Sequence, residues 1–591
     1  MREGTTTWVG VDTETPVKRD GYLKSVVNRT FRNYANKTRP PFVEMNVSFY
    51  DEEDENVFRN GSIKGIKFFK GTKRKTNPFI VVCVHDRILA GLITPNAIVF
   101  YPAIYKGLSI KAEKAFFCKA EDVLVFQNGI DYPLYWRGGF TPGNPLEQMK
   151  AVYESSFVGS SPMMLGKMMV YCHGRIFLVD DNDLVYASDH IYSQGITLNS
   201  NEAVLKFSES FYPSSGDGFS AISEMEEVTG ICAVKKSGTL TGHGEVFVLC
   251  RNGAYSIDPT PVRNQWTAQS IQKTLFIGSG CSAYDSLVNA GEDIFYRDSE
   301  GHISSIRFSY SQLASDYQAD SLSQDVDKYL SYDKSQLMDF SKSIFTNGRL
   351  LFSTAIEAKE STLGGSHIFS NGLLPIDFKR SETKMRFEGL WTGPRVSHMS
   401  NAFSCGVKFP VFTSFDTDGV NRIYTMGEIG DDFVNGESKK IVSFYIQKKL
   451  FHSNEKEAPI SKKMIKTHEF LYEDQKGEFS VESLASPNGS KCFYQLMKPK
   501  TFGFSCVEFD KKTCLPVESS ELNNFIIGEK PCDDLKQSQW YDVATVIRGN
   551  VSIISDIVSA EITKTETSSS CKLSSNKCCG FEEEQTFNNQ F

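Results

Sequence analysis

The sequence has 591 residues, of which 40% are hydrophobic and 12% aromatic, so the chain can bury a substantial core. Its formal net charge of −8 argues against a protein whose main task is to grip nucleic acid, because such domains usually carry a basic excess. No apolar run approaches the roughly eighteen residues of a membrane-spanning helix, and the polar segment Met1–Thr15 lacks the apolar core of a signal peptide. The 14 cysteines are scattered, several of them inside apolar runs, so we expect free buried thiols in a chain made in a reducing cytoplasm.

Residues 1–60 lack any regular strand pattern. They contain Asn36–Phe42, with two consecutive prolines, and the acidic run Asp51–Glu55. We expect an extended N-terminal arm that leads into the first folded unit.

Residues 61–434 repeat a short pattern in which a polar or glycine-containing turn joins two alternating apolar strands. Such alternation around Asn-Gly or Asp-Gly turns is typical of β-hairpins. The copies begin roughly 35 to 70 residues apart, which leaves room for about four strands each, the size of a propeller blade. The pattern therefore predicts an all-β fold, an irregular β-propeller of six to eight blades; the alternative is a pair of β-sandwiches. The hairpins lie near residues 85–100, 121–136, 173–186, 244–255, 292–296, 347–352 and 406–424.

The C-terminal part differs in composition. Residues 435–565 are richer in Lys and Ser and have longer strands, such as 440–446, which predicts an additional β-sandwich-like segment. Residues 566–591 are polar and low in complexity, with Cys571, Cys578 and Cys579, and we expect a flexible tail.

Signatures of catalysis are missing from the sequence. There is no His-Glu-x-x-His helix, no Gly-x-Ser-x-Gly elbow and no phosphate-binding loop. The glycine loop Ile277–Cys281 lacks a third glycine and predicts a plain turn. The acidic turn Asp180–Asp183 lacks the glycine and glutamate that complete a calcium loop. The tail cysteines match no zinc spacing. We therefore predict no catalytic, cofactor-binding or metal-binding residues and no enzyme.

Two further groups of residues favour structural roles. His85, His173, His243 and His302 stand in or beside hairpin turns, where they satisfy turn backbone more often than they form an active site. The basic run Lys70–Lys75 could touch DNA phosphates, but a solvated loop or a contact with an acidic neighbour is the preferred interpretation.

Several motifs follow one another over about residues 35–430: Thr38–Pro41, Glu121–Gly129 with Pro133–Trp136, Gly174–Phe177 with Tyr186–Asp189, Arg251–Ser256 with Asn264–Trp266, Ile277–Cys281 and Phe387–Gly393. Their order resembles that in the propeller-containing tail hub, or nozzle, proteins of short-tailed double-stranded DNA bacteriophages. The cysteine-bearing tail is not part of the pattern.

The resemblance implies a virion structural protein that is assembled in the host cytoplasm and located in the viral tail. In that family several copies, typically six, form a ring below the portal and adaptor around the channel through which DNA leaves. They retain the genome until ejection. The partners so implied are the chain itself, the portal, the adaptor and other tail proteins, and passing double-stranded DNA without sequence specificity; insertion into a membrane is not expected. An acidic or mixed channel surface would let the duplex slide, whereas a basic one would hold it.

Two other functions remain open at this stage. One is a glycan-binding or glycan-cleaving propeller for receptor recognition, for which Glu121, Asp122, Glu292 and Asp293 at strand starts are the candidate carboxylates. The other is a cellular propeller hub for protein interactions, against which the irregular repeat spacing counts.

Overall fold

The computed structural model describes residues 1–562 apart from short internal segments. The segments left out are 16–17, 33–34, 72–76, 140–145, 157, 160, 192–199, 211–222, 237–241, 268–270, 291–292, 313–320, 379–385, 453–461, 491, 503–522 and 529–536. The predicted C-terminal tail with its cysteines, most of the basic run Lys70–Lys75 and the candidate Glu292 lie outside the described residues.

Antiparallel β-sheets make up most of the described chain, so the predicted all-β class is confirmed. Five of the sheets lie between residues 46 and 305. Their strands are β8 (Asn46–Phe49), β9 (Ile63–Phe69), β10 (Phe79–Val84), β11 (Arg87–Ile93), β12 (Ala97–Phe100) and β13 (Tyr105–Lys106); β14 (Phe116–Ala120), β15 (Val123–Gln127), β16 (Leu134–Trp136) and β17 (Lys150–Ala151); β18 (Met168–Cys172), β19 (Arg175–Val179) and β20 (Val185–Ala187); β21 (Val228–Lys235), β22 (His243–Cys250), β23 (Gly253–Ile257) and β24 (Gln272–Ile277); and β25 (Val288–Ala290), β26 (Asp293–Arg297) and β27 (Ile303–Ser305).

The sixth sheet is larger. Most of its strands follow the fifth sheet in the chain, but one of them comes from the N-terminal part of the chain. In spatial order its strands are β28 (Ser343–Thr346), β29 (Arg349–Glu360), β30 (Ser366–Asp377), β32 (Val396–Ser404), β33 (Val407–Phe415), β34 (Asn421–Met426), β7 (Phe42–Glu44), β35 (Asp432–Val434) and β36 (Glu437–Lys439), with β31 (Arg386–Phe387) beside β30. The α-helices among the described residues are short: α1 (Glu52–Asn60), α3 (Ile306–Gln312) and α4 (Asp327–Leu330).

The predicted hairpins form with tight turns. Cys172 pairs with Arg175 across His173-Gly174, and Thr346 pairs with Arg349 across Asn347-Gly348. Both central residues of each turn have positive φ, 47° and 74° in the first and 49° and 72° in the second. This is the conformation that two-residue hairpins require and that glycine and asparagine tolerate, so the turn chemistry explains why the hairpins form where the sequence places them.

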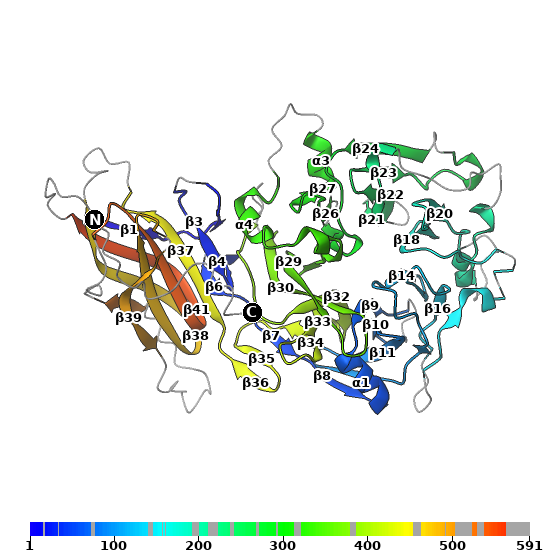
Figure 1. The fold of residues 1–591 in the computed structure, drawn as a ribbon, viewed down its shortest axis with the longest axis horizontal. Coiled ribbons are helices and arrows are strands. Elements are labelled where there is room, and N and C mark those ends of the chain that lie inside the picture. Colours follow the sequence, from blue (N-terminus) through cyan, green and yellow to red (C-terminus); the bar gives the residue numbers. More distant parts are fainter. Residues whose placement is uncertain are drawn as a thin grey trace.

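The six sheets are arranged in a ring, seen on the right of Figure 1. Strands of successive sheets contact one another in a closed circuit: β9 to β14, β14 to β18, β18 to β21, β21 to the turn η8 (Tyr284–Ser286) just before β25, β25 to β28, β28 to β32, and β32 back to β9. Because β28 and β32 belong to one sheet, the circuit does not fix the number of blades, which stays a prediction. The circuit favours a propeller-like ring over two β-sandwiches.

The N-terminal segment closes the ring. Strand β7 lies between β34 and β35, where Thr425 pairs with Val43, and β8 pairs with β12 in parallel at the other side of the closure. The acidic run Asp51–Glu55, expected within an extended arm, belongs instead to α1. Asp51 caps this helix by accepting hydrogen bonds from Glu53 N and Asp54 N, and acidic side chains in the first turn favour a helix N-terminus.

Another sheet, which we call the long-strand sheet, lies beside the ring, on the left of Figure 1. It contains β37 (Val442–Leu450), β38 (Lys463–Pro487), β39 (Tyr494–Phe502), β40 (Asn523–Gly528) and β41 (Tyr541–Ile562), with four N-terminal strands, β1 (Arg2–Thr5), β4 (Ser25–Val27), β5 (Arg29–Thr30) and β6 (Asn36–Thr38). Gly549 has a φ of 112° in β41 and lies beside register shifts with β38, where β-bulges bend paired strands. The predicted C-terminal segment therefore shares one sheet with residues of the predicted arm.

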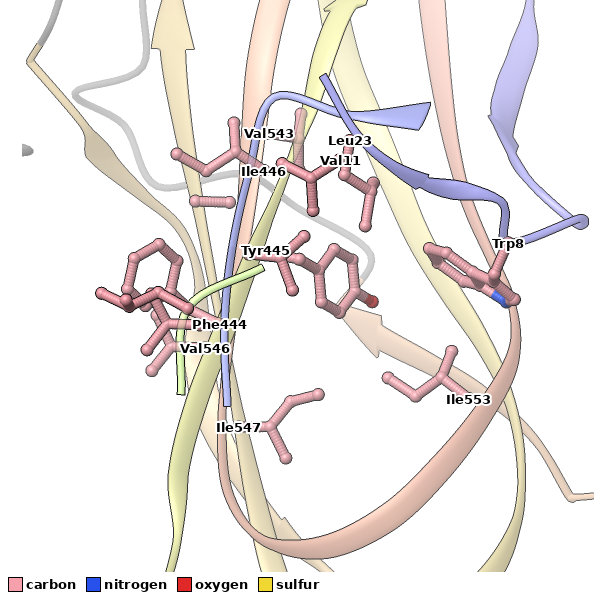
Figure 2. Close-up of a cluster of buried hydrophobic side chains, with 14 of the residues drawn as sticks. Trp8, Val11, Leu23, Phe444, Tyr445, Ile446, Val543, Val546, Ile547 and Ile553 are labelled. Atoms are coloured by element: carbon pink, nitrogen blue, oxygen red, sulfur yellow. The ribbon is translucent and has the colours of Figure 1, made fainter. Parts of the chain in front are cut away.

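Residues 8–11 and 22–23 also pack on one face of this long-strand sheet. Figure 2 shows Trp8, Val11 and Leu23 packed against Tyr445 and Ile446 of β37. The rings of Trp8 and Tyr445 meet edge to face at 5.4 Å, and the Trp8 indole donates a hydrogen bond to the Ile554 carbonyl at 2.8 Å. The same buried cluster continues into strands of the ring, so the two parts share one hydrophobic core. Two short strands, β2 (Gly10–Val11) and β3 (Tyr22–Leu23), hold this segment together.

Candidate functional site

Two of the motifs behind the family resemblance meet in space, between the long-strand sheet and the ring. Arg39 is buried, and its guanidinium donates to Asn28 Oδ1 at 2.9 Å, to the Thr392 carbonyl at 2.6 Å and to both carboxylate oxygens of Asp432. Gly393, with a φ of 157°, lies against the same guanidinium, and a Cβ there would come within 3.0 Å of NH2. Thr38–Pro41 and Phe387–Gly393 thus form a structural joint.

A second buried ion pair belongs to this joint. Glu388 accepts hydrogen bonds from Arg349 Nε at 2.6 Å, from Thr30 Oγ1 and from the Phe31 backbone N–H. The Trp391 indole donates to the Arg29 carbonyl at 2.8 Å. Every polar group named here is satisfied by another part of the chain, which is the pattern of a packed joint and not of a substrate site.

The carboxylates singled out for glycan chemistry do not come together. Glu121 lies in the β14–β15 turn and accepts a hydrogen bond from the Tyr171 hydroxyl at 2.9 Å, and Asp122 follows it in the same turn. Asp293 begins β26, three sheets further along the chain, and accepts from the backbone N–H groups of Ile294 and Arg307. Glu121 and Asp293 thus lie in separate sheets with separate hydrogen-bond partners, and Glu292 lies outside the described residues.

A serine, a histidine and an aspartate form a hydrogen-bonded chain inside the long-strand sheet. Ser483 Oγ lies 2.6 Å from His468 Nδ1, and His468 Nε2 lies 2.6 Å from Asp556 Oδ1. The Tyr445 hydroxyl donates to Asp556 Oδ2 at 2.5 Å, and burial raises the pKa of Tyr445 well above its ordinary value. All four side chains are fully buried, so no substrate reaches the serine. The chain resembles a catalytic triad only in its residue types, and its role is to join β37, β38 and β41.

The histidines near the hairpins occupy turn positions. His85 and His173 are first central residues of two-residue turns, with φ of 51° and 47°. The His173 backbone N–H donates to His243 Nδ1 at 3.1 Å. Burial lowers the pKa of His85 and His243. His302 is different because its side chain lines a cavity, as described below.

A small cavity lies between several strands of this circuit. It has a volume of about 80 Å³ and is lined by residues in or next to β9, β14, η8, β28 and β32, among them Lys67, Asp285, Lys342 and His398. Burial lowers the pKa of Lys342 to about 8 against the opposing effect of Asp285, and Lys342 Nζ donates to the Phe340 carbonyl at 2.9 Å. We call this the axial cavity.

A larger cavity, which we call the lateral cavity, opens between β24 and β26–β27. Its volume is about 540 Å³, within the range of small-molecule sites. The loop Ile277–Cys281, predicted to be a plain turn, supplies Gly278 and Ser279 to one wall. The turn that joins β26 to β27 supplies Asp298, Glu300 and His302 to another. No sequence pattern predicts that these residues lie together, because they come from separate hairpins and match no motif.

A further site among the described residues could rest on a reactive thiol, a group of metal ligands or a membrane-spanning helix. Burial raises the pKa of Cys83, Cys118, Cys172 and Cys250 to about 12, so these thiols are unreactive at neutral pH. Within the described ranges, no three His, Cys, Asp or Glu side chains are placed to hold a metal ion. None of the helices in the part of the chain that the structure describes is long and apolar enough to cross a membrane.

Comparison with protein-family models finds no match for the chain, and comparison with curated proteins finds none either. Among solved structures, the computationally designed Ika8 protein is similar over 65% of this chain and 99% of its own, with 10% identity and a TM-score of 0.33. The structure of YCF48 bound to D1 peptide is similar over 66% of this chain and 96% of its own, with 7% identity and a TM-score of 0.29. Both TM-scores are too low to carry an inference about this chain.

Proposed function

We propose that this chain is a structural protein of a viral tail, a hub or nozzle whose copies form a ring, typically of six, around the exit channel for double-stranded DNA. In this role it helps to retain the genome and releases it at ejection. Its partners are further copies of itself, the portal, the adaptor and other tail proteins, and it turns over no substrate. The proposal starts from the order of the sequence motifs.

The positions of those motifs support a scaffold. Gly174–Phe177 and Arg251–Ser256 lie in hairpins of the ring, and Thr38–Pro41 and Phe387–Gly393 form the buried joint with the long-strand sheet. A resemblance carried by packing residues concerns architecture and assembly, whereas a resemblance in an enzyme family would concentrate at a catalytic cleft.

In the proposed assembly the channel is enclosed by several copies, each of which contributes a surface. The formal net charge of −8 suits a surface along which phosphates slide without being held.

The main structural support for self-assembly is an exposed pair of aromatic side chains. Tyr132 and Tyr153 are 72% and 58% exposed, and their rings meet edge to face at 5.4 Å beside the half-exposed Ile130. We call these three residues the tyrosine patch. Tyrosines are enriched at protein interfaces and at the residues that dominate binding energy. Two large aromatic side chains that are exposed to solvent and in contact with each other therefore support a contact with another protein.

Cryo-electron microscopy of tailed particles from a genome that encodes this chain tests the proposal. We expect a ring of copies below the portal, and we expect Tyr132→Ser with Tyr153→Ser to reduce incorporation of the chain at least tenfold. Val262→Ser is the matched control, since Val262 is 61% exposed and lies in another part of the ring. Particles that lack the chain, or that hold it only as isolated monomers, would contradict the proposal.

A further inference from the structure

The same aspartate-capped turn joins the second and third strands of three ring units. In each turn the aspartate backbone N–H donates to the carbonyl four residues later: Asp180 to Leu184, Asp298 to His302 and Asp416 to Val420. In the first two, Oδ1 also accepts from the backbone N–H groups two and four residues on, at 2.9 and 2.8 Å for Asp180 and at 3.0 and 2.8 Å for Asp298. Because the three turns are structurally equivalent, a difference in the partners of their aspartates indicates a local role beyond the turn itself.

The second carboxylate oxygen sets Asp298 apart. Asp180 Oδ2 accepts from the Asn182 side chain, and Asp416 Oδ2 accepts from Arg422 and from the Tyr424 hydroxyl at 2.5 Å. Asp298 Oδ2 has no hydrogen-bond partner among the described residues, although Asp298 is 6% exposed and lines the lateral cavity. Burial raises the pKa of Asp298. This oxygen is therefore an acceptor that a group bound in the lateral cavity can use.

A histidine in the same turn is held in a fixed orientation. His302 Nδ1 lies 3.2 Å from Asp327 Oδ1, which also accepts from Ser323 Oγ at 2.9 Å. His302 Nε2 makes no hydrogen bond to any described residue, and the ring lines the lateral cavity. The Asp327 carboxylate thus fixes the imidazole and leaves its other nitrogen available to a ligand.

The other lining groups define the ligand chemistry. Ser279, Ser304, Ser309 and Ser321 present hydroxyls, and Gln324 presents an amide, so the walls offer donors as well as acceptors. Among the described lining residues three side chains are carboxylates and none is Lys or Arg, which disfavours phosphates and acidic sugars. An ammonium group can only donate, whereas a hydroxyl group both donates and accepts and so matches walls that offer both. Phe276 and Phe308 add apolar surface.

We propose that the lateral cavity binds an uncharged carbohydrate, with Asp298 Oδ2 and His302 Nε2 bonded to its hydroxyl groups. A sugar hydroxyl both donates and accepts, as the serine and amide walls require, and the apolar face of a sugar ring fits against a phenylalanine. Such a site lies outside the proposed assembly role and is independent of it.

Binding of the purified full-length chain to an array of neutral, sialylated and sulfated glycans, followed by calorimetric titration of the sugars that bind, tests this site. We expect neutral sugars to bind. We expect Asp298→Asn to weaken them at least tenfold, because the amide keeps an oxygen for the turn but replaces the free acceptor with a donor. Asp180→Asn is the matched control in the equivalent turn and should leave binding unchanged. Glu300→Gln, at an exposed position of the same cavity, gives a second readout if Asp298→Asn does not fold.

Three outcomes would overturn the inference: no neutral sugar binds at millimolar concentration, only acidic glycans or the polyamine spermidine bind, or Asp180→Asn weakens binding as much as Asp298→Asn does. If the ring assembles normally in particles while no sugar binds, the carbohydrate site fails alone and the proposed assembly role stands. Conversely, a chain that binds neutral sugars through Asp298 but is absent from particles refutes only the assembly role.

Discussion

Arg39 forms two parallel hydrogen bonds to Asp432, from NH1 to Oδ1 at 2.8 Å and from NH2 to Oδ2 at 2.6 Å. The arginine side chain is 1% exposed and the aspartate 12% exposed, so water screens this pair little. Asp432 Oδ1 also accepts from the Phe42 backbone N–H at 2.8 Å. One carboxylate therefore fixes both the joint with the long-strand sheet and the start of the strand that closes the ring.

Removal of this carboxylate should destabilise the protein strongly. Asp432→Ala leaves a buried guanidinium without its counter-charge, a change that typically costs about 3–5 kcal/mol. We expect a large fall in the midpoint of thermal unfolding measured by circular dichroism. Glu478→Ala is the control, because the Lys440–Glu478 pair is 46% and 59% exposed and such pairs contribute less than about 1 kcal/mol. Equal effects of the two substitutions would contradict this interpretation of the joint.

Closure of the ring by β7 gives a second prediction. Val43 pairs with Thr425 of β34 on one side and with Phe433 of β35 on the other. Val43→Pro removes a backbone donor from a strand with two neighbours, where proline is not tolerated. We expect faster hydrogen exchange of the β34 and β35 amides by mass spectrometry. Val43→Thr keeps the donor and the branched side chain, so it should exchange like the unaltered protein.

The buried serine, histidine and aspartate give a third prediction. Because Ser483 is fully buried, a fluorophosphonate probe for serine hydrolases should not label it in the folded chain, as mass spectrometry of tryptic peptides would reveal. Ser483→Ala should lower stability by about 1–3 kcal/mol, since it leaves His468 Nδ1 unsatisfied. Ser490→Ala, at an exposed position, should change it by no more than about 0.5 kcal/mol. Labelling of Ser483 would mean that the long-strand sheet opens.

Local sequence signals predicted the hairpins well and the long-range pairing poorly. His173-Gly174 and Asn347-Gly348 predict their turns because glycine and asparagine adopt positive φ at low energetic cost. No local sequence pattern predicts that Asn36–Thr38 pairs with β41 or that Val43 pairs with β34. Strands that are distant in sequence are paired through tertiary packing. An arm without regular pattern was therefore the natural prediction for residues that the structure distributes over both sheets.

The lateral cavity shows the same limit for function. The sequence drew attention to Ile277–Cys281 as a glycine loop and to His302 as a turn histidine, but each had a structural explanation by itself. Their common cavity depends on the side-by-side packing of two ring units, which no spacing of residues encodes. Asp298 in particular has the same local turn as Asp180, and only the absence of a neighbour for its second oxygen distinguishes it.

The axial cavity gives a pH-dependent prediction. The Lys342 pKa is lowered to about 8 by burial, opposed by Asp285 and aided by Lys114, from an ordinary value of 10.5. Between pH 8 and 10.5 the unfolded chain holds a proton on this lysine that the folded chain has lost, so Lys342 makes stability rise with pH in this window. Below pH 8 both states are charged, and the buried charge costs the folded state about 3 kcal/mol.

Lys342→Met should consequently stabilise the protein at pH 7 and flatten the rise in stability between pH 8 and 10.5, as measured by chemical denaturation over a pH series. His398, also in the axial cavity, is neutral throughout this window because burial lowers its pKa well below the ordinary value, and it therefore does not obscure the effect. Lys334→Met, at an exposed position, is the control and should leave the slope unchanged. A Lys342→Met chain that is less stable at pH 7, with the original slope, would mean that Lys342 is charged and well paired in the folded protein.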